Sequence, residues 1–136
     1  EVTVGSVGGS GYQYESQGCA KIQAATADNP TYAFAMPGNM VQMGGIVNLP
    51  NIGPGVAVDN NPVTLPRELA NANYVVQLTV ITESGFQQIA VDASNRTKTG
   101  FEVCARNNDA AATITGAKVA WTVVGIMPMT TFSGLA

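Results

Sequence analysis

The stretch "KVAWTVVGI", residues 118–126, alternates large apolar residues with a second set that is itself mostly apolar. Because successive side chains of a strand point to opposite faces, Val119, Trp121 and Val123 share one face. The opposite face carries Ala120, Thr122, Val124 and Ile126. A strand that is apolar on both sides is buried on both sides. We therefore expect one face to pack on the core of the domain and the other on a neighbouring subunit.

Alternation of apolar and polar residues with a period of two extends over most of the chain and predicts an all-β protein. Six strands are expected, over residues 40–48, 60–66, 73–82, 86–94, 99–106 and 114–126. A Gly/Pro-rich loop, "PNIGPGVAVDNN" at 50–61, joins the first two, and no stretch predicts a helix longer than one turn. Short strands bounded by turn residues at this spacing are typical of an antiparallel β-sandwich.

Within these strands the pattern also predicts which side chains face the core. The inward set is Val76, Leu78, Val80, Ile89, Val91, Ala93, Phe101, Val103, Ala105, Val119, Trp121 and Val123. Trp121, the only tryptophan, is thus expected in the core rather than as a platform for a sugar ring. Residues 95–99 predict a polar turn, after which Gly100 relieves the backbone and Phe101 restarts the core face.

Charge is sparse in this sequence: 11% of the 136 residues are charged, 46% are hydrophobic, and the net charge is −3. A monomer with so little charge is poorly protected from association, which supports a subunit interface. The six basic residues are scattered, whereas nucleic-acid binding needs a clustered basic surface, so that class of protein is excluded. No run approaches the ~20 apolar residues of a membrane span, and none resembles a signal peptide, so we expect no membrane insertion.

The chain has no histidine, which removes the commonest general base, the Ser-His-Asp and Cys-His schemes and most transition-metal sites. Its nine acidic residues are spread singly, with no two at a spacing that suggests a catalytic pair. The glycines of "GSVGGSG", residues 5–11, lack the Gly-Lys-Ser/Thr ending of a phosphate loop and indicate a flexible connector. We therefore expect no enzyme, no metal and no cofactor, and we expect Cys19 and Cys104 to be free thiols.

Five elements occur in an order that resembles a known family: "MVQMGG" (40–45), "PVTLP" (62–66), "NANYVVQLTV" (71–80), "NRTKTGF" (95–101) and "VAWTVVGI" (119–126). Together they resemble the C-terminal domain of phage tail-fibre proteins, which is similar in turn to the H-type lectin sandwich. The likeness covers about residues 40–126. It departs from the family pattern at Met43, where a tryptophan is usual, and at Val123-Val124-Gly125, which replaces the commoner ending.

The resemblance implies a six-stranded antiparallel β-sandwich, assembled as a homotrimer at the distal end of a virion's tail fibre. It also implies a non-catalytic role in adsorbing the particle to a host cell-surface glycan. In the lectin branch, polar and histidine side chains near subunit boundaries contact the sugar. Because this chain has no histidine, that sugar site is not carried over to it.

The expected organisation combines this likeness with the composition of the segments on either side of it. Residues 1–38 form a Gly/Ser-rich, strand-bearing lead-in that connects to the fibre shaft, residues 39–126 form the lectin-like sandwich, and residues 127–136 form a tail along a neighbouring subunit. The chain begins at Glu1 rather than at a methionine, so we expect a fragment or a processed product of a longer protein.

Connectivity locates a candidate binding site. If each strand crosses the sandwich from end to end, the loops gather at two ends: 49–59, 83–86 and 107–113 at one, 67–72 and 95–98 at the other. The chain enters from the shaft at the second end, so the first points outward, and loops on a rigid sandwich commonly carry binding sites. The candidate glycan contacts on these outer loops are Asn51, Glu83, Phe86, Asn107, Asn108 and Asp109.

Three hypotheses for function come from this reading. The first is a receptor-binding fibre tip without catalytic activity, and the second is a structural trimerisation cap that closes the fibre and binds nothing. The third is a catalytic domain such as a depolymerase, which needs the paired carboxylates that the sequence does not offer. A glycan array on the isolated domain separates the first two.

Overall fold

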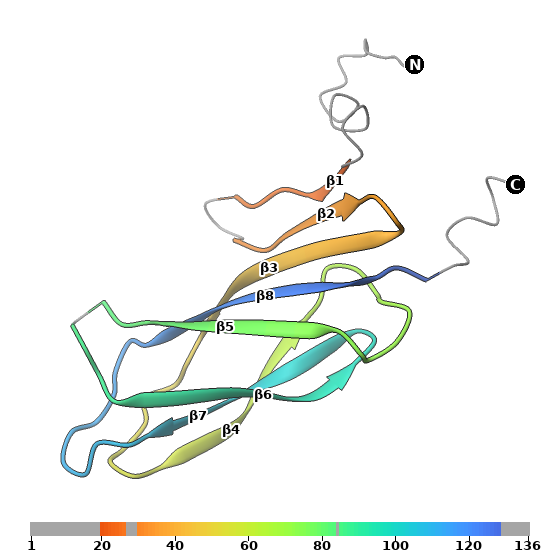
Figure 1. Ribbon diagram of the computed structural model, residues 1–136. Coiled ribbons are helices and arrows are strands. Elements are labelled where there is room, and N and C mark those ends of the chain that lie inside the picture. The colour runs from red at the N-terminus through yellow and green to blue at the C-terminus, as the bar shows by residue number, and fades with distance from the viewer. Residues whose placement is uncertain (1–19, 27–29, 84, 129–136) are drawn as a thin grey trace, which may run out of the picture.

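The computed structural model describes residues 20–26, 30–83 and 85–128, and these residues form strands and their connections (Figure 1). The strands in this part of the chain are β1 (Ala20–Gln23), β2 (Tyr32–Met36), β3 (Met40–Asn48), β4 (Ala57–Thr64), β5 (Val75–Ile81), β6 (Ile89–Thr97), β7 (Gly100–Asn107) and β8 (Lys118–Ile126). The all-β prediction is confirmed. Within the same residues, no helix has the length and apolarity needed to cross a bilayer.

The strands form two antiparallel sheets, seen as an upper and a lower layer in Figure 1. One sheet has five strands in the order β1-β2-β3-β8-β5, and the other has three in the order β4-β7-β6. The six expected strands correspond to β3 to β8. The sheet is larger than expected because β1 and β2 also pair into it, with Phe34 of β2 opposite Gln42 of β3.

Strand β8 is an interior strand of the five-stranded sheet, between β3 and the edge strand β5. It pairs on one side with β3, with Trp121 opposite Gly45, and on the other with β5, with Trp121 opposite Leu78. A Cβ on Gly45 would lie 3.0 Å from the Trp121 ring, so the missing side chain leaves room for the indole. The register therefore brings the bulkiest core residue against the smallest one.

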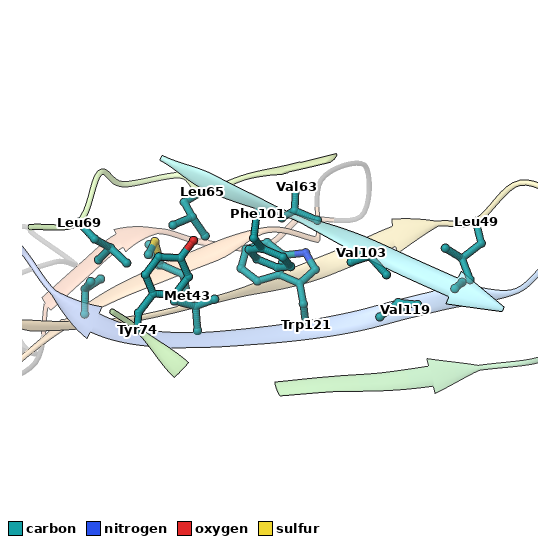
Figure 2. Packing of buried hydrophobic residues seen from close by; sticks show 14 of the residues in the cluster. Met43, Leu49, Val63, Leu65, Leu69, Tyr74, Phe101, Val103, Val119 and Trp121 are labelled. Atoms are coloured by element: carbon teal, nitrogen blue, oxygen red, sulfur yellow. The ribbon is translucent and has the colours of Figure 1, made fainter. Parts of the chain in front are cut away.

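The core lies between the two sheets and contains the predicted inward residues except Val80, which is half-buried and lies outside the cluster (Figure 2). Trp121 is 4% exposed, and its ring meets the Phe101 ring from β7 edge-on, with centroids 5.7 Å apart and planes at 79°. Val103, Val119 and Val123 are fully buried around this pair. Edge-to-face packing of two large aromatic rings contributes about 0.5–1.5 kcal/mol beyond the area they bury. This contact joins the two layers at their centre.

Strand β4 begins earlier than the sequence indicated. The prediction of a loop over 50–61 is wrong for its last part, because Ala57 already pairs with Arg106 of β7. The register shifts between Val58 and Asn61, and the Asn61 amide donates to the Val103 carbonyl at 2.9 Å. A bulge of this kind interrupts the alternation that marks a strand, so the pattern hid the start of β4.

The polar turn is shorter than predicted, because β6 continues to Thr97 and only Lys98 and Thr99 connect it to β7. Asn95 lies in the strand with a φ of +50°, and its amide donates to a Glu102 carboxylate oxygen at 2.6 Å. Gly100 is needed for a different reason from the one expected: a Cβ there would lie 2.3 Å from the Val63 carbonyl oxygen. The glycine thus permits close approach of β4 and β7.

Tyr74 closes the core at the end of the sandwich where the β6–β7 turn lies. Its ring is buried, and its hydroxyl donates to the Gly100 carbonyl at 2.7 Å. The Arg96 guanidinium lies 5.8 Å from the Tyr74 ring centroid and also donates to the Tyr74 carbonyl. Burial raises the pKa of Tyr74, so the hydroxyl remains a donor at every physiological pH.

The outward-facing surfaces of the two sheets differ in composition. We call the outer surface of the five-stranded sheet the apolar face; on β2, β3, β8 and β5 it consists of Tyr32, Phe34, Met36, Met40, Gln42, Gly44, Ile46, Asn48, Val75, Gln77, Thr79, Ile81, Lys118, Ala120, Thr122, Val124 and Ile126. Among these residues only Lys118 is charged. We call the outer surface of the three-stranded sheet the polar face; it includes Ala57, Pro62, Ala90, Asp92, Ser94, Glu102, Cys104 and Arg106.

Candidate functional site

Three connections meet at one end of the sandwich, on the left of Figure 1: β3–β4, β5–β6 and β7–β8. Ile52 and Ile114 exchange backbone hydrogen bonds of 3.0 and 2.9 Å between the first and third of these connections. The Asn108 amide donates to the Gln88 carbonyl at 2.9 Å, which ties the third to the second. The predicted grouping of these loops is therefore confirmed. We call this region the loop end.

The remaining connections lie at the opposite end of the sandwich. The Leu69 amide donates to the Lys98 carbonyl at 2.9 Å, which joins the β4–β5 connection to the β6–β7 turn. Ala70 donates to Ile126 at the end of β8, and Met127 donates to Asn39 just before β3. Strand β1 also starts at this end, because Ala20 pairs with Ala35 near the β2–β3 turn. Both ends of the sandwich therefore contain the loops that the predicted connectivity assigned to them.

Asn107, at the end of β7, holds the loop end together from inside. Its side chain is fully buried, and its amide nitrogen donates to the Ile52 carbonyl at 2.9 Å and to the Ala112 carbonyl at 2.8 Å. Its amide oxygen accepts a hydrogen bond from the Asp109 amide at 2.8 Å. A buried amide without such partners would cost about 1–3 kcal/mol. Asn107 therefore positions the loops and has no exposed surface to offer a ligand.

Asp109 is fixed by the turn that follows it. One carboxylate oxygen, Oδ1, accepts hydrogen bonds from the Ala111 amide at 2.8 Å and from the Ala112 amide at 3.0 Å. These two backbone bonds lower the pKa of Asp109, because they favour the charged form. The carboxylate is consequently ionised at neutral and mildly acidic pH, with its orientation set by the backbone.

A depression of about 220 Å³ opens between the β5–β6 and β7–β8 connections. It is lined by Phe86, Gln87, Gln88, Asp109, Ala112, Thr113 and Ile114. Phe86 is 93% exposed, which is unusual for so large an apolar side chain in a protein surface. The depression thus combines a free aromatic face with amide, hydroxyl and carboxylate groups that can form hydrogen bonds.

The structure brings together only two of the six predicted contacts, Phe86 and Asp109. Glu83 lies outside the lining of the depression, with its carboxylate 3.9 Å from the Lys118 ammonium. Asn51 and Asn108 are exposed at the loop end but do not line the depression, and Asn107 is buried beneath it.

Sequence reasoning missed the amides of Gln87 and Gln88 and the Thr113 hydroxyl. The sequence "ESGFQQIAV" places two consecutive amides after the exposed aromatic residue, which is a usable signal. It was hidden because strand β6 was expected from residue 86, which assigned Gln88 to the outward side of a strand. The strand begins at Ile89 instead, so both glutamines belong to the connection.

A second depression of about 200 Å³ lies on the polar face, lined by Ala57, Asp59, Ala90, Asp92, Cys104, Ala105 and Arg106. The Cys104 thiol there lies 3.2 Å from the Ser94 hydroxyl and 3.4 Å from the Asp59 carbonyl. Cys104 is a free thiol, as predicted, whereas Cys19 lies outside the described residues. Within the described ranges, no three His, Cys, Asp or Glu side chains are grouped as metal ligands would be.

Neither a family model nor a curated protein matches the chain. Two solved structures share its fold despite low sequence identity. A C-terminal part of the P. aeruginosa R1 pyocin fibre matches with a TM-score of 0.58 and 13% identity, over 79% of this chain and 28% of that chain. An N-truncated R1-type pyocin tail fibre matches with a TM-score of 0.59 and 12% identity, over 91% of this chain and 99% of that chain. The fold is that of a pyocin tail fibre.

The tail-fibre resemblance read from the sequence motifs is confirmed at the level of the fold. This chain spans 28% of the length of the first pyocin structure and 99% of the second.

Proposed function

We propose that the chain is the non-catalytic receptor-binding tip of a tail fibre, which adsorbs a phage or a phage-like particle to a glycan on the host cell surface. The observation that carries this proposal is the exposed Phe86 ring beside the Asp109 carboxylate at the loop end of a pyocin tail-fibre fold. A sugar ring offers an apolar face to an aromatic side chain and hydroxyl groups to a carboxylate.

The orientation of the fibre supports the same site. In the described part of the chain, β1 starts at the end opposite the loop end. A shaft that precedes β1 therefore joins the sandwich at that opposite end, and the loop end points away from the particle. On this proposal the loop end lies at the distal tip, where the fibre first meets a cell.

We further propose that the domain functions as a homotrimer in which the apolar face is buried against neighbouring copies. Ile46, Val75 and Ile126 are 42%, 64% and 50% exposed on this face in the isolated chain. Tyr32 and Phe34 add an aromatic pair to it, with ring centroids 5.6 Å apart. A contiguous apolar surface of this kind is typical of a subunit interface.

The alternative is a structural cap that trimerises the end of the fibre and binds no receptor. The apolar face supports this alternative as well as the first proposal, because trimerisation alone accounts for it. The two proposed functions differ at the loop end, because a cap that binds no receptor gives no reason for an exposed phenylalanine beside a carboxylate.

The test is adsorption of the full chain to host cells and to a glycan array, with variants at the loop end. Phe86→Ala and Asp109→Asn should weaken binding while leaving the melting temperature nearly unchanged, because the asparagine oxygen can still accept the Ala111 and Ala112 amides. A lost aromatic contact of about 1 kcal/mol weakens one site about fivefold, and three sites in a trimer multiply the loss through avidity.

Lys98→Ala, an exposed residue at the opposite end, serves as the control and should bind as the wild type does. Loss of binding in Lys98→Ala with both loop-end variants unaffected would place the receptor site at the β6–β7 turn instead. If the wild-type chain binds neither cells nor any glycan, the structural cap is the correct reading.

A further inference from the structure

The lining of the loop-end depression carries charge of one sign. Asp109 is the only charged residue among those that line it, and no lysine or arginine does so. The nearest charged pair at this end is Glu83 with Lys118, in which the carboxylate partly neutralises the ammonium. A ligand in the depression therefore meets one negative charge without a positive one to balance it.

The Asp109 carboxylate is held in place rather than free to turn away. Oδ1 accepts the Ala111 and Ala112 amides, and Oδ2 receives no hydrogen bond from the residues that the structure describes. One oxygen is thus used to orient the group, and the other remains for a ligand. A sugar hydroxyl is a suitable partner because it donates a hydrogen bond, whereas a second carboxylate only accepts one.

The remaining groups of the lining suit an uncharged ligand. The Gln87 and Gln88 amides and the Thr113 hydroxyl each combine a donor with an acceptor, as sugar hydroxyls do. The Phe86 ring presents a face of weakly negative potential, which favours C–H groups over an anion. Recognition of acidic ligands in proteins commonly uses arginine or lysine, and neither lines this depression.

We infer that the loop-end depression selects uncharged, hydroxyl-bearing sugars and discriminates against sugars that carry a carboxylate, such as uronic acids. This inference rests on the proposed function, because it specifies the ligand of the same site. Two like charges a few ångströms apart at a protein surface repel each other enough to weaken binding about tenfold. The expected discrimination is therefore about tenfold for a sugar carboxylate placed beside Asp109.

The experiment uses matched pairs of immobilised oligosaccharides in which a hexose is replaced by the corresponding uronic acid. Binding of the full wild-type chain is measured at neutral pH and low salt. The hexose member of each bound pair should bind about tenfold more tightly than its acidic counterpart. Because salt screens exposed charges, this ratio should shrink when the ionic strength is raised.

Asp109→Asn tests whether this one carboxylate is responsible. The asparagine oxygen can still accept the Ala111 and Ala112 amides, so the turn should be preserved, which an unchanged melting temperature would verify. In this variant the preference for the hexose should fall to within about twofold. Asp92→Asn removes the same charge from the polar face and should retain the wild-type ratio.

Each outcome bears on a different claim. If acidic and neutral members bind the wild type equally, or if Asp109→Asn keeps the full preference, the inference fails while receptor binding by the domain stands. If Asp92→Asn lowers the ratio as much as Asp109→Asn, the effect is one of net charge and the inference also fails. If the wild type binds no oligosaccharide at all, both the inference and glycan binding are overturned.

Discussion

The apolar face exposes Val75 and Ile126, whereas the polar face on the opposite side of the sandwich presents Asp92 and Arg106. Both surfaces come from antiparallel strands that bury their other side in the same core. An antiparallel sheet needs only one buried face, and water can cover the other. The polar face follows this pattern and the apolar face does not. The proposed trimer accounts for this difference, because it would bury the second surface of the five-stranded sheet against neighbouring copies.

The same contrast is visible in two single strands. β7 alternates buried Phe101 and Val103 with outward Glu102 and Arg106, as expected for a strand with one face in the core and the other in contact with solvent. β8 buries Val119 and Val123 but turns Val124 and Ile126 outward. Nothing in the packing of the residues that the structure describes requires those last two side chains to be apolar. Their apolar character is what motivates the proposed trimer.

The largest expected effect is on the hydrophobic core, against which both sheets pack. Trp121→Ala should destabilise the domain by about 3–5 kcal/mol, because it empties the centre of the core where the indole meets Phe101. Thermal or denaturant unfolding measures the loss. Since both outer faces depend on this core, oligomer and monomer should be affected alike. A variant that melts like the wild type and loses only ligand would contradict the buried position.

The next effect separates the two faces. Val124→Asp places a charge on the apolar face and should cost several kcal/mol of assembly energy, because the charge is buried without a partner in the proposed trimer. Light scattering at micromolar concentration should show dissociation to a folded smaller species.

Two controls sharpen this test. Ala90→Asp puts the same charge on the polar face, opposite Arg106, and should leave the oligomer intact. Lys118→Asp, at the start of β8, should disturb assembly less than Val124→Asp. A wild-type chain that is a stable folded monomer at micromolar concentration would contradict the proposed trimer and the role of the apolar face as its interface.

The smallest effect is expected on the polar face itself. Glu102→Gln replaces a carboxylate that accepts a hydrogen bond from Asn95 at 2.6 Å at an exposed position. Such surface charges contribute about 0–1 kcal/mol, and the glutamine oxygen can still accept the bond. The change in unfolding free energy should therefore stay within about 0.5 kcal/mol. A loss of 2 kcal/mol or more would mean that the polar face is covered by a partner as well.

The sequence predicted the core well because alternation reports directly which way a strand side chain points. Phe101, Trp121 and the valines beside them were assigned to the interior from that pattern alone, and they are buried. The same pattern carries no information about which strands pair. For this reason the joining of β1 and β2 to β3, next to a Gly/Ser-rich stretch, did not emerge from it.

The candidate site was only partly predictable. Phe86 stood out because no core position required it, and Asp109 because it follows a strand in a loop. Asn107 looked equally available in the sequence, yet it is buried, because its partner Ile52 lies 55 residues away and only the folded chain brings them together. Bulges such as the one between Val58 and Asn61 moved strand boundaries for a similar reason. Contacts between residues far apart in the sequence, and register shifts between paired strands, leave little trace in the local alternation of apolar and polar residues.

The hydrogen bonds of Asn107 have a consequence for how the binding surface can evolve. Its amide holds the loops through the backbone carbonyls of Ile52 and Ala112, which every amino acid possesses. The exposed side chains of Phe86 and Thr113 contribute nothing to that framework. Point substitutions at such positions can therefore alter which molecule is recognised without disturbing the scaffold. Under the proposed function, single substitutions at these positions would change the receptor without loosening the loops, whereas loss of the Asn107 amide would remove the donor that both carbonyls share.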